Sequence, residues 1–70
     1  MMLTDLKPGN WGRIVAIEGG CGVREMLALR GISEGSAVRL ISCRRGPVVI
    51  EVDRSTIALG RGIAKKIRVV

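Results

Sequence analysis

The spacing of apolar residues in the second half of the chain is typical of β-strands. In residues 36–44 and again in residues 48–53, apolar and polar side chains alternate, which gives each segment one apolar face. The expected inward residues are Val38, Leu40 and Ser42 in the first segment and Val48, Ile50 and Val52 in the second. A turn with the sequence RRGP joins the two segments, so we predict a β-hairpin.

Three further strands are predicted at other apolar segments. Residues 11–18 follow a turn-forming Pro-Gly pair and are almost continuously apolar, which indicates a strand with both faces partly covered. A short strand at residues 57–59, a glycine-bounded turn and a last strand with inward Ile67 and Val69 complete the chain. Short strands hide their edges when the sheet closes on itself. We therefore expect a mainly β fold, a small SH3-like five-stranded barrel.

One short helix is predicted between the first and second strands. Val23, Met26 and Leu27 fall within about 100° on a helical wheel, which predicts an amphipathic helix of two turns. Gly31 stands where a C′ glycine belongs. Ile32, one residue later, is placed to contact Leu27 as in the Schellman arrangement.

Three glycines precede this helix in the stretch EGGCG. A phosphate-binding loop is not predicted, because no lysine follows Gly19, Gly20 or Gly22. The third glycine of a dinucleotide fingerprint is replaced by Glu25, a carboxylate where pyrophosphate would bind. We expect instead that the three glycines allow positive φ angles in a compact strand-to-helix connection.

Composition changes this picture by suggesting a partner. The 70 residues form one expected domain, residues 1–70, with 47% hydrophobic residues, a mean hydropathy of +0.32 and one aromatic residue, Trp11. So small a core cannot enclose all of this apolar surface. The remainder is expected either as a patch that another molecule covers or as isolated exposed side chains.

The net charge of +6 is concentrated in the second half of the chain. Residues 1–35 carry four basic and four acidic groups, whereas residues 36–70 carry eight basic and two acidic groups. The residues expected to form a basic face are Arg44, Arg45, Lys65, Lys66 and Arg68. Such a face attracts nucleic acid, anionic lipid or acidic protein, or remains a solvated surface.

Catalytic and metal-binding chemistry is not expected. The chain has no histidine and no nucleophile motif, and neither Cys21 nor Cys43 has a predictable base. We therefore predict no enzyme, no cofactor and no metal site within the chain, and we expect each cysteine to be reduced and at least half-buried. A metal-bridged assembly that uses the two cysteines and surface carboxylates of several chains stays open as an alternative.

Five segments, in order, resemble the FeoA family. They are LTDLKPG, GRIVAIEGGCG, LALRGISEG, GPVVIEVD and IALGRGIAKKIRV, and they cover almost the whole chain. The resemblance implies an SH3-like barrel and a non-enzymatic accessory protein of ferrous iron uptake. It also implies protein–protein contact with FeoB, a membrane transporter with a cytoplasmic G domain. The oligomeric state is not implied.

The resemblance is carried over only to the helix and its exit loop, where we predict that Met26, Leu29 and Arg30 bind the partner. Leu29 falls off the apolar stripe, and Arg30 offers a charge-assisted hydrogen bond. The family usually has an apolar residue where this chain has Arg30, so the contact here is expected to be more polar. Alternatively, Met26 belongs to the core and Leu29 covers the barrel opening.

The expected location is cytoplasmic, with peripheral contact at the inner membrane through the basic face. Residues 1–20 lack the apolar stretch of a signal peptide, and no apolar run approaches the roughly 20 residues of a membrane span. The alternative function is a small basic barrel that binds RNA or other nucleic acid through phosphates. We regard it as the less favoured, because base stacking needs aromatic side chains and the chain offers only Trp11.

Overall fold

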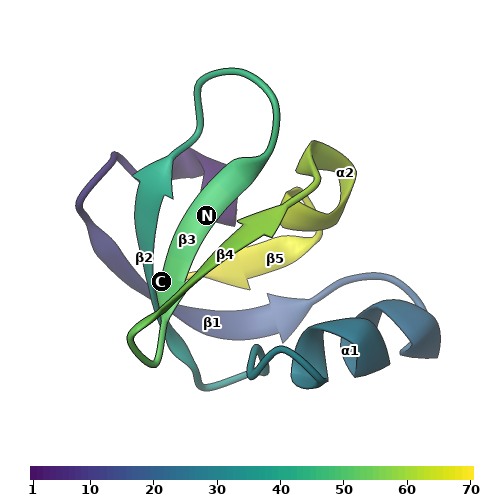
Figure 1. Ribbon diagram of the computed structural model, residues 1–70. Coiled ribbons are helices and arrows are strands. Elements are labelled where there is room, and N and C mark those ends of the chain that lie inside the picture. The colour runs from purple at the N-terminus through teal and green to yellow at the C-terminus, as the bar shows by residue number, and fades with distance from the viewer.

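A computed structural model describes residues 1–70 as one antiparallel sheet with two short helices and a 3-10 turn (Figure 1). The elements in chain order are η1 (Leu3–Asp5), β1 (Trp11–Ile17), α1 (Cys21–Ala28), β2 (Ala37–Ser42), β3 (Val48–Val52), β4 (Ser55–Leu59), α2 (Arg61–Ala64) and β5 (Ile67–Val69). The strands lie in the order β4-β3-β2-β1-β5, and the predicted β2–β3 hairpin is confirmed. Neither helix has the length or the apolar character needed to cross a membrane.

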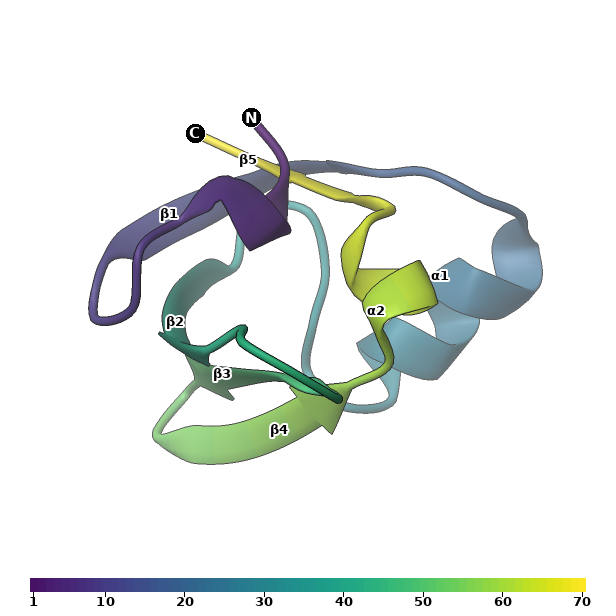
Figure 2. The same ribbon diagram turned by 90° about the horizontal axis from the view of Figure 1, so that it is seen from above.

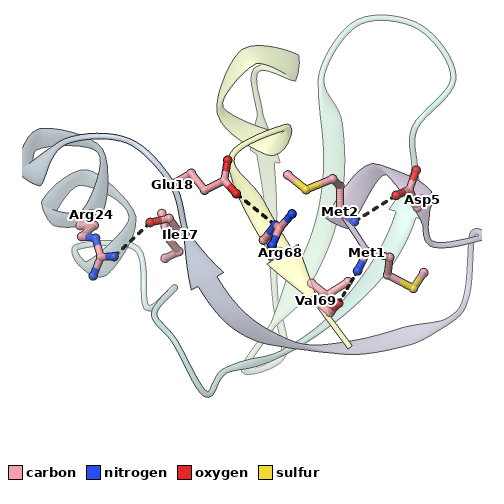
Figure 3. Close-up of polar contacts among 8 residues, drawn as sticks. All are labelled: Met1, Met2, Asp5, Ile17, Glu18, Arg24, Arg68 and Val69. Carbon is pink, nitrogen blue, oxygen red and sulfur yellow. Dashed lines mark hydrogen bonds and ion pairs between the residues drawn. The ribbon is translucent and has the colours of Figure 1, made fainter.

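The sheet is open, with β4 and β5 at its edges, which corrects the prediction of a closed barrel. The strands curve around the core, and α2 spans the gap between β4 and β5 (Figure 2). The start of the chain covers the outer edge of β5 instead. Met2 pairs with Arg68, and the Val69 N–H donates to the Met1 carbonyl at 2.7 Å. The amino group of Met1 in turn donates to the Val69 carbonyl at 3.2 Å (Figure 3). Residues 1 and 2 thus take the position beside β5 that β4 would occupy in a closed barrel.

The core lies inside this curved sheet and is entirely apolar. Its members are Leu3, Ile14, Ile17, Leu27, Ile32, Val38, Leu40, Val48, Ile50, Val52, Leu59, Ala64, Ile67 and Val69. The predicted inward residues of the hairpin and the last strand are therefore buried, except that Ser42 is half-buried. No polar side chain is buried, so packing alone holds the interior together.

β1 differs from its prediction, because only one of its faces is covered. Ile14 and Ile17 are buried, whereas Val15 is 48% exposed on the opposite side. An irregularity in the pairing with β5 between Ile14 and Ala16 lets two isoleucines three positions apart point the same way. Gly12 supports the close packing, since a Cβ there would lie 3.2 Å from Leu6 Cδ1. A continuous apolar run therefore does not imply two covered faces.

The turn between β3 and β4 has an unusual backbone. Its two central residues, Asp53 and Arg54, have φ angles of +50° and +67°, and Val52 pairs directly with Ser55. Two-residue hairpin turns with positive φ at both positions match the twist of the strands, but they favour Asn-Gly or Asp-Gly. Aspartate tolerates this conformation better than most residues. Arginine has no such advantage, so Arg54 is strained.

Candidate functional site

α1 begins after a glycine that the backbone requires. Gly19 has a φ of +112°, as predicted, and turns the chain out of β1. The expectation for the other two glycines is wrong. Gly20 is the N-cap in an extended conformation, and Gly22 already lies inside the helix. A glycine permits a positive φ angle but does not impose one.

Arg24 fixes the helix to both of its neighbouring segments. Its guanidinium donates to the Ile17 carbonyl at the end of β1, at 3.1 Å (Figure 3). It also pairs with Glu34, beyond the helix, at 3.4 Å. Leu27 is fully buried beneath the helix, and Val23 packs against the core beside it. One core leucine and one arginine thus position the helix on the sheet.

The end of α1 is the predicted Schellman arrangement. The Ile32 N–H donates to the Leu27 carbonyl at 2.9 Å, and the Gly31 N–H donates to the Ala28 carbonyl at 3.0 Å. Gly31 has a φ of +79°, and Leu27 and Ile32 are both fully buried. The exit from the helix is therefore held by backbone hydrogen bonds and by the core, which gives the exposed residues next to it a fixed place.

The three predicted partner-binding residues lie together on the outside of α1 and its exit. Met26 is followed three residues later by Leu29 and four residues later by Arg30, a spacing that places them on one side of a helix. Met26 is 38% exposed and Leu29 89% exposed, so neither belongs to the core and Leu29 covers no opening. Arg30 is exposed, and its side chain takes part in no ion pair.

A small pocket of about 160 Å³ lies on the other side of α1. It is lined by Ile17, Arg24, Ala28, Ile32, Ser33 and Glu34. Sequence reasoning missed this pocket, because it depends on Arg24 and Glu34 meeting across the helix exit. Those two charged side chains already pair with each other. The hydroxyl of Ser33 in the lining lies 3.5 Å from the hydroxyl of Ser36 and has no activating base beside it. The pocket therefore contains no catalytic cluster.

The predicted basic face is brought together only in part. Arg44 and Arg45 lie in the β2–β3 loop, and Arg61 of α2 holds this loop by donating to the carbonyls of Cys43, at 2.8 Å, and of Arg44. Lys65 follows Arg61 by four residues and lies on the same side of the helical turn. Arg44, Arg45 and Lys65, here called the basic cluster, have no ion-pair partner.

The other two predicted basic residues lie elsewhere. Arg68 on β5 pairs with Glu18 at 3.0 Å, so its charge is matched (Figure 3). Lys66 extends along the β1–α1 loop, where its Cδ is 3.3 Å from the position of a Cβ at Gly19. The role of Arg61 in holding the loop was also missed, because nothing local in the sequence links it to residues 43 and 44.

The cysteines do not come together. Both are free: Cys43 is half-buried, as expected, but Cys21 is exposed at the start of α1. In the first helical turn only Val23 packs against the core, which leaves Cys21 exposed. No group of three His, Cys, Asp or Glu side chains is arranged to hold a metal ion. A metal bridge between chains stays a prediction.

Comparison of the sequence with known proteins identifies the FeoA family. The model of the FeoA domain matches residues 1–70. A protein of Methanocaldococcus jannaschii named "Putative Fe(2+) transport protein A" is 41% identical over 67 residues, which cover 96% of this chain and 82% of that protein.

Solved structures support the same relationship. The crystal structure of an iron uptake regulatory protein (FeoA) superposes with a TM-score of 0.91 at 30% identity, covering 100% of this chain and 93% of that one. The fold alone is shared with Stenotrophomonas maltophilia FeoA in complex with zinc, a procaryotic SH3 domain protein. Its TM-score is 0.82 at 20% identity, with 100% and 89% of the two chains covered. The SH3-like fold is thereby confirmed.

Proposed function

The chain belongs to the FeoA family of ferrous iron transport proteins, and we propose that it acts by direct contact with an FeoB-type membrane transporter. FeoA proteins are accessory transport proteins rather than a family of enzymes. The chain also has no histidine, the side chain most often used for proton transfer at neutral pH. Iron is then the cargo of the transporter.

The observation that carries the proposal is the exposure of Leu29. A leucine that is 89% exposed gains about 1.5–3 kcal/mol when a partner buries it completely. Because the Schellman end fixes the backbone at this point, little conformational entropy is lost on binding. Met26 extends the apolar surface, and Arg30 adds a hydrogen-bond donor for an acidic group of the transporter. We assign these three residues to the contact.

In the proposed complex with the transporter, the basic cluster adds a second, weaker attraction, to the anionic lipids of the membrane. A protein bound to the cytoplasmic side of a transporter lies close to the anionic inner leaflet. There each of Arg44, Arg45 and Lys65 contributes about 1 kcal/mol. Arg61 holds the loop that carries the two arginines, so the charges are presented from a defined surface. We therefore propose a cytoplasmic protein with peripheral membrane contact.

Nucleic acid binding is not favoured as the function. The family indicates a role in ferrous iron transport. In addition, Trp11, the only aromatic residue of the chain, already contacts an arginine side chain. The guanidinium of Arg39 lies 5.8 Å from the centre of the Trp11 ring, which covers one face of the only platform for stacking bases.

The proposal is tested by Leu29→Glu in a strain that lacks its own copy of the gene. We expect this variant to lose both the rescue of ferrous iron uptake and co-purification with the G-domain transporter from membranes. Val70→Glu is the matched control, because Val70 is also a highly exposed aliphatic residue, at 72%, and should behave like the unchanged protein. Normal uptake with a folded Leu29→Glu variant would refute the assignment.

A further inference from the structure

The two outer edges of the sheet are protected very differently. The edge of β5 is occupied by Met1 and Met2, whose backbones hydrogen-bond and pair with Val69 and Arg68. The outer edge of β4 has no neighbouring strand. β4 pairs with β3 through five consecutive residue pairs without an irregularity, so the strand is regular. An edge of this kind presents unpaired N–H and C=O groups to any strand that can approach.

The side chains of β4 do nothing to discourage such pairing. Natural edge strands are usually blunted by lysine, proline or a bulge. The sequence of β4, STIAL, contains neither lysine nor proline, and it is the only strand without a charged residue. In a chain with a net charge of +6, the absence of charge at this edge removes the repulsion that two copies would otherwise meet there.

We propose that β4 pairs antiparallel with β4 of a second copy of this chain, joining the two sheets across a two-fold axis. In the register centred on Ile57, each Ile57 faces its equivalent, Thr56 faces Ala58, and Ser55 faces Leu59. Ile57 is half-buried against the core at the edge of the sheet, so the isoleucine pair buries apolar surface that one copy leaves uncovered.

The pairing is confined to the five residues of the strand. Asp53 and Arg54, with φ angles of +50° and +67°, form the turn that precedes β4, and Arg61, which follows it, begins α2. Within those five residues the strand is complementary to itself, because its central residue is apolar and it carries no charge. These properties favour a second copy of this chain over a charged segment. With only five residues a side, the contact is small and the dimer depends on concentration.

Sedimentation velocity from micromolar to millimolar protein concentration tests the proposal, together with Thr56→Lys. Thr56 is exposed on the edge strand, and lysine blunts edges in natural sheets. Val15→Lys is the control, because it adds the same charge to an exposed position on the interior strand β1. Circular dichroism establishes that both variants fold.

We expect the unchanged protein and Val15→Lys to dimerise, and Thr56→Lys to raise the dissociation constant about tenfold or more. Backbone amides of β4 should also exchange more slowly as the concentration of the unchanged protein rises. A protein that stays monomeric at millimolar concentration would overturn the proposal, as would Thr56→Lys dimers of unchanged affinity. Neither result bears on Leu29, so the transporter contact is tested separately.

Discussion

Replacing Arg54 by glycine should stabilise the protein. Arg54 has a φ of +67°, a conformation that costs an L-residue about 1–2 kcal/mol. Glycine removes this cost, although its greater freedom in the unfolded chain takes back about 0.4–1 kcal/mol. The Arg54 side chain takes part in no ion pair, so the substitution loses no such contact. The free energy of unfolding should rise by roughly 1 kcal/mol, which raises Tm by about 4–8 °C in a domain of this size.

Arg54→Ala separates the backbone effect from the loss of charge. It removes the same guanidinium from a chain of net charge +6 but retains a Cβ at positive φ. Urea denaturation followed by circular dichroism measures both variants, and an unchanged m value keeps the comparison valid. If Arg54→Gly is no more stable than Arg54→Ala, the backbone of this turn is not strained and our account of the hairpin is wrong.

Two further substitutions test the packing of α1 and the loop that carries the basic cluster. Leu27→Ala should lower the free energy of unfolding, measured by urea denaturation, by about 2–5 kcal/mol, because Leu27 is fully buried. A loss below about 1 kcal/mol would mean that the packing of α1 hardly depends on the Leu27 side chain. Arg61→Met should speed amide hydrogen exchange in residues 44–46 and cost about 1.5–3 kcal/mol, because methionine has no donor for the carbonyls of Cys43 and Arg44. Unchanged exchange would contradict the role of Arg61.

Local patterns predicted the elements whose determinants are local. Alternation identified the buried face of the β2–β3 hairpin, and the spacing from Leu27 to Ile32 predicted the end of α1, because hydrogen bonds within six residues define that end. The exposure of Leu29 followed from its position off the helical stripe. Each of these features depends on residues that are close in sequence.

Features that depend on distant residues were not predictable. The pairing of Met1 and Met2 with the last strand joins the two ends of the chain, and it decides that β5 is covered while β4 is open. The two hydrogen bonds from Arg61 to the β2–β3 loop likewise join residues that are 17 and 18 positions apart in the sequence. Alternation states which side of a strand is apolar, but it carries no information about which strand becomes its neighbour.

The pairing of β1 with β5 determines when this protein is able to fold during synthesis. β1 forms early in the chain, but its inward side chains are enclosed only when β5 (Ile67–Val69) pairs with it. Residues 1 and 2 also need β5, because Met2 pairs with Arg68. A nascent chain still lacking residues 67–69 therefore exposes aliphatic side chains on a sheet that has lost an edge. The sheet is therefore completed only after residues 67–69 have emerged from the ribosome, and until then the aliphatic side chains of the nascent strands stay exposed.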